Sequence, residues 1–364
     1  MAVPVSAPPR ARSQPARRVL DQTLLRHLGI AVVAGLVLYV LTLSLSAYNN
    51  LQLATMAYYF VAIAGLTVLT GQNGQISLGH GALMAVGAYA TVKIQDALSW
   101  PLALVLLAAS LVAAIAGVLA GAAAARLRGP YLAGATLALA VGLPSLATRF
   151  SGFFGGTNGL AVAPPTPPAS LGATFPLERW QAWIACIAAL VVYILLANLV
   201  RSGYGRAFRA VRDDEVAAQL AGLHIARTQI IAFVVSAACA GLAGGLLVVV
   251  TSLVAPGAFP LSLSVALLTG VVLGGTGSLP GAVWGAAALV LVPTWADDVS
   301  NALSLSANVQ ANLSLLIYGA VLIGVILAAP GGIQGALRGL AGLARRVREP
   351  QSRGPAPRTE EERS

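Results

Sequence analysis

The feature that most constrains this chain is the length of its apolar runs. A helix needs about 20 apolar residues to cross the hydrocarbon core of a bilayer, and about ten segments near that length follow one another. Alternating segments of the kind found in transmembrane β-barrels are absent. Hydrophobic residues make up 57% of the chain and charged residues only 9%, whereas soluble proteins average about 25% charged residues. The sequence therefore predicts an all-α, polytopic transmembrane helical bundle with spans near 28–47, 51–70, 76–93, 101–125, 130–149, 180–200, 229–252, 261–275, 281–296 and 312–330.

The distribution of basic residues predicts the orientation of this bundle. With both termini in the cytoplasm, every one of the 22 basic residues except Lys93, Arg149 and Arg179 falls on the inner side. Cytoplasmic loops of membrane proteins carry such an excess of Lys and Arg. The segment 201–228 is then a cytoplasmic loop. The segment 150–179 is an external loop with room for one short helix. Nucleic-acid binding is a weaker explanation of the net charge of +10.

The chain divides into three parts. Residues 1–26 are rich in Ala, Pro and Arg and predict a disordered cytoplasmic segment. Residues 27–335 form the transmembrane domain, whose first apolar run is too long for the core of a signal peptide. Residues 336–364 form a charged cytoplasmic tail. Cys186 and Cys239 fall inside predicted spans, where thiols act as small apolar side chains, so we expect neither a disulfide nor a metal site.

The polar interval 201–228 interrupts the apolar runs. Phe208, Val211, Val216, Leu220 and Leu223 recur in it at roughly helical spacing, and charged residues lie between them. The glycine at position 222 stands where a helix would end. The pattern predicts a short amphipathic helix at the membrane surface, with one face for a partner. The alternative is an ordinary positively charged loop that only sets topology.

A second polar stretch, GQNGQISLGHG at 71–81, lies between two predicted spans that leave no room for a loop. It must therefore lie at or within the membrane boundary. Its glycines permit close approach of helices, and its amides, hydroxyl and imidazole supply neutral hydrogen-bonding groups. An intramembrane histidine is a candidate functional group, so we expect this stretch to line a path for solute. The alternative for His80 is a packed imidazole with satisfied hydrogen bonds.

Two short spans, 261–275 and 281–296, are joined by GGTGSLPG. Short hydrophobic segments interrupted by Gly and Pro are typical of discontinuous helices at transport sites. Small residues four positions apart allow helix backbones to touch in lipid. We therefore expect close packing at Gly117/Gly121, Gly241/Gly245, Gly270/Gly274 and Gly281/Gly285.

Several activities are disfavoured by what the sequence does not contain. A P-loop needs a lysine beside its phosphate-binding glycines, and the only lysine is Lys93, so ATP would have to be hydrolysed by another polypeptide. The acidic residues lie outside the predicted spans or at their margins, which disfavours a proton-coupled carrier. The sequence also contains no catalytic cluster such as H-E-x-x-H, so an enzyme is not expected. A sodium-coupled carrier and a passive channel remain open.

Three stretches together resemble a known family. They are GQNGQISLGHGALMAVGAY at 71–89, GRAFRAVRDDEVAAQLAGLHIART within the 201–228 interval, and GGTGSLPGAVWGAAAL at 274–289. Each is similar to the corresponding stretch of branched-chain amino acid ABC transporter permeases of the LivM-like family, and the resemblance covers about 50–340. It implies a multi-pass permease subunit of an importer in the bacterial inner membrane. The solute would be a branched-chain or other neutral amino acid, passed from a periplasmic solute-binding protein to the cytoplasm.

The resemblance also implies partners. They are two cytoplasmic ABC ATPase subunits, a second related permease subunit, the periplasmic binding protein and membrane lipid. A closely similar subfamily carries urea and short amides, which is the first alternative. An ion-coupled secondary transporter is the second. No cofactor is implied.

Site residues follow from the same resemblance. In such importers this loop carries an EAA---G pattern and docks the ATPase; here Ala217, Ala218 and Gly222 keep that spacing and the acid is displaced to Glu215. The candidate ATPase-coupling residues are Arg206, Arg209, Arg212, Asp213, Glu215, Ala217, Ala218 and Gly222. The candidate residues of the substrate path are Gly71, Gln75, Ser77, Gly79, His80, Gly274, Gly275 and Ser278. We expect no catalytic residue.

Overall fold

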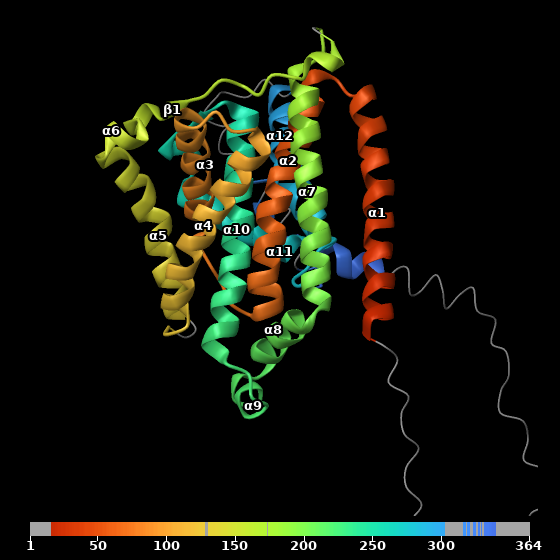
Figure 1. The fold of residues 1–364 in the computed structure, drawn as a ribbon, viewed down its shortest axis with the longest axis vertical. Helices are drawn as coiled ribbons and strands as arrows, with labels where there is room; N and C mark the ends of the chain where they lie inside the picture. The colour runs from red at the N-terminus through yellow and green to blue at the C-terminus, as the bar shows by residue number, and fades with distance from the viewer. Residues whose placement is uncertain are drawn as a thin grey trace, which may run out of the picture.

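The computed structural model describes residues 16–127, 130–172, 174–302 and 331–339, together with single positions between 316 and 329. The described chain is almost entirely helical (Figure 1). Its first half contains α1 (Ala16–Ser44), α2 (Ala47–Leu66), the π-helical turn η1 (Thr67–Gln72), α3 (His80–Ala97), α4 (Leu102–Ala124), α5 (Pro130–Arg149), α6 (Ser151–Phe154), η2 (Gly156–Asn158), β1 (Leu160–Ala161) and η3 (Ala169–Leu171). Its second half contains α7 (Leu177–Arg201), α8 (Gly203–Asp213), α9 (Glu215–Leu220), α10 (Ile225–Thr251), β2 (Leu253–Val254), η4 (Pro256–Ala258), α11 (Leu261–Gly274) and α12 (Gly281–Ala302).

The long helices form a bundle with α2 and α10 inside. In the most apolar stretches of α10 and α2, 78% and 72% of the residues are buried within the protein, against 22–33% in α4, α5 and α7. In Figure 1, α1 and α7 lie at one side of the bundle and α5 at the other. A helix that is apolar all round is buried or faces lipid. The outer helices therefore present apolar side chains to the surroundings, as the composition predicts.

Seven helices among the described residues are long and apolar enough to cross a membrane. Helix α1 adds a shorter apolar stretch, Gly29–Ser44, and α3 is packed against α4 and α10 although it is not among the seven. The polytopic helical bundle is thus confirmed. The predicted third span, 76–93, begins later, at His80, because the residues before it are not helical. The predicted span 312–330 lies mostly outside the described residues, and the number of crossings and the side of the termini stay predictions.

The glycines spaced four apart lie where helices touch. A Cβ atom added to Gly241 would lie 2.2 Å from the Cβ of Ala113, so α10 and α4 approach closely there. A Cβ added to Gly285 would lie 2.2 Å from the carbonyl oxygen of Gly270, which joins α12 to α11 in the same way. Van der Waals packing replaces the hydrophobic drive between helices in lipid. The packing prediction for these residues is confirmed.

The two ends of the bundle differ in structure. One end carries α6 and β1, and β1 pairs antiparallel with β2 through Leu160↔Val254 and Ala161↔Leu253. This short pair is a departure from the all-α prediction and ties the 150–179 loop to the segment after α10. The opposite end carries α8 and α9 below the long helices (Figure 1).

The chain ends also differ from the expectation. Helix α1 begins at Ala16 and so extends into the segment 1–26 expected to be disordered; the pattern VLDQTLL continues the helix toward the N-terminus. Residues 332–339 form a helical segment at the start of the predicted tail. Residues 1–15 and 340–364 lie outside the described residues.

Candidate functional site

The interval 201–228 forms two helices rather than the single amphipathic helix predicted. Ser202 caps α8, since its hydroxyl accepts a hydrogen bond from the Tyr204 amide at 3.2 Å. Asp214 has an extended backbone and caps α9, accepting from the amides of Val216 at 2.8 Å and Ala217 at 3.0 Å. An Asp that caps a helix lies outside it. The break therefore falls at Asp214, which a hydrophobic period does not reveal.

The end of α9 agrees with the prediction. Gly222 has a φ of +86°, and the amide of Leu223 donates to the carbonyl of Ala218 at 3.0 Å. This left-handed glycine cap is a common way to end a helix. It turns the chain back toward α10.

The break divides the predicted apolar face into two. Phe208 and Val211 of α8 are 0% and 2% exposed, so they pack into the bundle. Val216 and Leu220 of α9 are 68% and 85% exposed. The prediction of one continuous apolar face is therefore wrong, because the two helices point their apolar side chains in different directions.

The charged coupling candidates also divide. Arg209 and Arg212 reach inward: Arg209 Nη1 donates to Gln72 Oε1 at 3.0 Å, and Arg212 Nη1 donates to the Gly71 carbonyl at 2.7 Å. Asp213 pairs with its neighbour Arg212 at 2.7 Å on the exposed side. Glu215 accepts from Gln229 of α10 at 3.1 Å. Of the remaining candidates, Arg206, Ala217 and Gly222 are exposed and Ala218 is buried.

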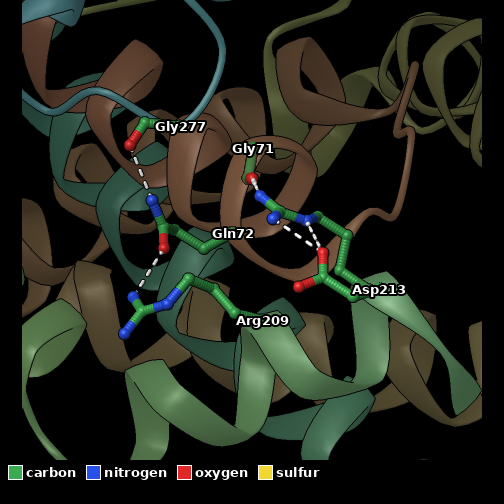
Figure 2. A network of polar contacts seen from close by, with 6 residues as sticks. Gly71, Gln72, Arg209, Asp213 and Gly277 are labelled. Carbon is green, nitrogen blue, oxygen red and sulfur yellow. Dashed lines mark hydrogen bonds and ion pairs between the residues drawn. The ribbon is translucent and has the colours of Figure 1, made fainter. Parts of the chain in front are cut away.

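Three distant parts of the chain meet at one place, which we call the polar junction and define as Gly71, Gln72, Arg209, Arg212 and Gly277. The Gln72 side chain contacts both of the other parts (Figure 2). Its Nε2 donates to the Gly277 carbonyl at 2.6 Å, and its Oε1 accepts from Arg209. A Cβ on Gly71 would lie 2.3 Å from the amide nitrogen of Gly277, so the backbones touch. Arg212 was predicted as a coupling residue and Gly71 as a residue of the path, and the structure brings the two into contact here.

The end of this stretch, residues 78–81, is held by hydroxyl groups of other helices. Both ring nitrogens of His80 have partners, Ser77 Oγ at 3.1 Å and Ser236 Oγ at 2.6 Å, and His80 and Ser77 are fully buried. The Gly81 amide donates to Ser264 Oγ at 2.9 Å, and the Leu78 amide donates to Thr136 Oγ1 at 3.0 Å. These are contacts of the kind expected for the packed imidazole. The hydroxyls of Thr136, Ser236 and Ser264 were not predicted as contacts of this stretch. The available signal was that isolated hydroxyl groups within apolar spans often hydrogen-bond to a neighbouring helix.

Two amide side chains in this stretch are buried and carry atoms that have no hydrogen bond among the described residues. Asn73 is 3% exposed and Gln75 6%. Neither the Nδ2 nor the Oδ1 atom of Asn73, nor the Oε1 atom of Gln75, has a hydrogen bond among the described residues. Leaving a buried polar group unpaired costs about 1–3 kcal/mol. These atoms can accept and donate hydrogen bonds to water or to a neutral solute.

The candidates at 274–278 lie beside the polar junction. Gly274 packs on Gly281, since a Cβ there would lie 2.1 Å from the Gly281 carbonyl oxygen. Gly275 has a φ of +111°, and a Cβ on it would lie 2.7 Å from the carbonyl oxygen of Gly331. Ser278 accepts a hydrogen bond from Arg338 at 3.0 Å. The remaining path candidate, Gly79, packs against the backbone of Thr136.

A hollow of about 530 Å³ lies beside α9, toward the start of α10. Its walls include Glu215, Gln219, Leu223, His224 and Gln229. The exposed face of α9 and this hollow together form a surface at the α8/α9 end of the bundle. Among the described residues, no group of His, Cys, Asp and Glu side chains is arranged to hold a metal ion.

Known proteins are similar to this chain in sequence. The model of the family described as branched-chain amino acid transport system, permease component, matches residues 47–326. High-affinity branched-chain amino acid transport system permease protein LivM is 31% identical over 67% of this chain in Salmonella typhimurium and 31% identical over 68% in Escherichia coli. The matched regions span 62% and 63% of those relatives.

A second kind of relative covers more of its own length. Permease protein LivH of Salmonella typhimurium is 29% identical over 79% of this chain and 94% of its own. No solved structure matches the chain. The family match covers all three segments that meet at the polar junction, and the apolar helices fit a multi-pass membrane protein. The chain therefore belongs to the family of permease components of branched-chain amino acid transport systems, which are transport proteins and not enzymes.

Proposed function

We propose that this chain is the membrane-spanning permease subunit of an ATP-binding-cassette importer in the inner membrane. It moves branched-chain or other neutral amino acids from a periplasmic binding protein into the cytoplasm, together with a second related permease. Two separate ATPase subunits drive it, since the single lysine of the sequence stands in no P-loop. The names of the relatives support the class of solute.

The exposed apolar face of α9 carries this proposal. Val216 and Leu220 are 68% and 85% exposed on a helix held by a cap at each end. An amphipathic helix that offers exposed apolar anchors is suited to dock in a groove of a partner protein. We assign the docking role to this face and to the exposed residues Arg206, Ala217 and Gly222. Arg209 and Arg212 reach inward and act on the bundle instead.

The buried amides of Asn73 and Gln75 support a path for a net-neutral solute. Their unpaired atoms are neutral hydrogen-bonding groups next to the glycines of the polar junction. No acidic side chain among the described residues lies in this stretch, and a proton relay generally needs such groups. A permease for urea or short amides uses the same chemistry and is the first alternative. An ion-coupled transporter is the second.

The docking proposal is tested by placing charges on α9. We expect Val216→Glu combined with Leu220→Glu to abolish copurification of the ATPase subunits and uptake of solute. Leu253→Glu is the matched control, because Leu253 is also exposed, at 42%, but lies in β2 at the opposite end of the bundle. Normal copurification and uptake by the α9 variant would contradict the proposal.

The solute and the energy source need their own measurement. The complete complex in proteoliposomes should take up radiolabelled leucine only with ATP inside. Uptake of urea in preference to leucine would favour the first alternative. Uptake by the permease alone down an ion gradient would favour the second.

A further inference from the structure

The side chain of Gln72 is engaged at both ends of its amide. It is 5% exposed, accepts from Arg209 Nη1 at 3.0 Å and donates to the Gly277 carbonyl at 2.6 Å. Figure 2 shows it between α8 and the loop that carries Gly277. An amide both accepts and donates, whereas a carboxylate only accepts. Glutamine is thus suited to connect a guanidinium with a carbonyl.

A second contact runs beside the first. Arg212 lies one helical turn after Arg209 and donates to the Gly71 carbonyl at 2.7 Å, so both arginines lie on the same face of α8. Arg212 also lies over Gly74, where a Cβ would be 2.8 Å from its Cγ. Helix α8 therefore holds the end of η1 at two adjacent residues.

The contact continues beyond Gly277. The neighbouring Ser278 accepts from Arg338 at 3.0 Å, and Trp284 Nε1 donates to Gln334 Oε1 at 3.0 Å. The loop 275–280 is thus bound to the helical segment 332–339 on its far side. This loop also joins α11 to α12, whose backbones touch at Gly270 and Gly285. Anything that moves the loop acts on both of these helices.

We propose that Gln72 is a positioning residue for transport, which transmits movement of α8 to the loop 275–280 and so to α11 and α12. The inference rests on the proposed function, in which the α8/α9 end receives the ATPase. A movement of α8 that left Gln72 behind would leave buried hydrogen-bonding groups unpaired, which is costly. Gln72 ends the π-helical turn η1, and such turns interrupt the regular α-helical bonding and occur often at functional sites. Gln72 hydrogen-bonds to both sides of the junction. Coupling also requires an element with two arrangements that both sites bias, and the distance measurement below tests for one.

The test uses the complete complex, with both permeases, the ATPases and the binding protein, in proteoliposomes. Gln72→Glu keeps an acceptor for Arg209 and loses the donor to Gly277; Gln72→Met loses both. We expect both variants to copurify with the ATPases and to take up at least tenfold less solute per ATP hydrolysed. The KM for solute should change less than twofold.

Gln181 provides the matched control. It is 3% exposed and donates to the Val249 carbonyl at 2.8 Å, so Gln181→Met removes a comparable buried bond. Its contact lies near the β1–β2 end, away from α8. We expect a wild-type ratio of uptake to hydrolysis for this variant, even if its thermal stability falls as much as that of Gln72→Met.

A wild-type ratio of uptake to hydrolysis in assembled Gln72→Glu and Gln72→Met complexes would overturn the inference. Should these variants not accumulate, Arg209→Met removes the same hydrogen bond from the α8 side. A wild-type ratio of uptake to hydrolysis in the Arg209→Met complex would also overturn the inference. Failure of the proposed function is distinguishable from failure of this inference. If the proposed function is wrong, the ATPases do not copurify even with the unaltered chain. A direct readout is the ATP-dependent distance change between spin labels at Ala210 and Val283, which we expect in the unaltered chain and not in Gln72→Met.

Discussion

The Nε2 atom of His80 lies 2.6 Å from the Oγ atom of Ser236, which is 156 residues further along the chain. Ser77 supplies the partner for the other ring nitrogen, and all three side chains are fully buried. The contact joins the start of α3 to the middle of α10. It positions the whole 71–81 stretch against the central helix of the bundle.

This contact predicts the effect of removing one hydroxyl. Ser236→Ala leaves a buried ring nitrogen unpaired, so we expect a loss of about 1–3 kcal/mol in stability. Ser110→Ala is the control, because the Ser110 hydroxyl of α4 donates to the carbonyl of Ala238, which lies two residues after Ser236 on α10. Removing that hydroxyl leaves a carbonyl that still accepts the hydrogen bond of its own helix. Thermal unfolding of the purified permease measures both. An equal and small effect would mean that the His80 contact contributes little.

The contact between α3 and α10 predicts a strong dependence on one glycine. A Cβ on Gly87 would lie 2.1 Å from the Gly241 carbonyl oxygen. Gly87→Ala forces the helices apart, and we expect a cost of about 1–3 kcal/mol, the usual range for overpacking. Gly142→Ala in α5 meets nothing within 4 Å, so replacing a helical glycine there should stabilise by about 0.5–1 kcal/mol. The unfolding midpoint should fall for Gly87→Ala and rise for Gly142→Ala. Shifts in the same direction for both variants would contradict this account.

The cap of α9 predicts a selective effect on docking. Asp214→Ala removes the acceptor for two amides and should destabilise α9 by about 1 kcal/mol, whereas Asp214→Asn keeps a cap. We expect weaker ATPase binding for the alanine variant only, measured by titrating the ATPase onto the permease. Asp213→Ala is the control, since its exposed pair with Arg212 contributes little. Equal ATPase binding by Asp214→Ala and Asp214→Asn would show that the cap of α9 does not contribute to docking.

The proposed path predicts a pattern of cysteine labelling. Gln75 and Ser77 are 6% and 0% exposed, while Ile76 between them is 51% exposed. In a chain whose Cys186 and Cys239 are replaced by alanine, Ile76→Cys should react with a water-soluble thiol reagent in every state. Gln75→Cys and Ser77→Cys should be protected in the resting state and react when the complex turns over ATP. Complete protection of these two in all states would refute their role in the path.

Much of the architecture could be predicted because it depends on local properties. The apolar runs predicted the helical bundle, and the glycines four apart predicted where α4, α10, α11 and α12 touch. The helical end at Gly222 was predicted from its tolerance of a positive φ. The break at Asp214 was not, because its side chain competes with the helix for the same amides and hydrophobic spacing does not report that competition.

The residues of the candidate site were harder to predict than the helices that carry them. Arg209 and Arg212 look like solvent-facing charges in the sequence, yet both donate hydrogen bonds to the end of η1 in the structure. The Arg212 side chain stays 38% exposed while it does so. Val216 and Phe208 look like members of one apolar face and lie in opposite environments. Gln72 stands within a recognised motif, yet no sequence pattern shows that its amide connects two distant segments.

The sequence by itself determined that this chain crosses a membrane as helices, because a backbone in lipid must satisfy its hydrogen bonds within each segment and apolar length is a local quantity. It also determined which stretches could not be ordinary spans. Only the tertiary structure decided that Gln72, Arg209 and Gly277 share one set of hydrogen bonds. Polar partners separated by 137 and 205 residues are chosen by how helices pack, and that choice depends on the whole bundle at once.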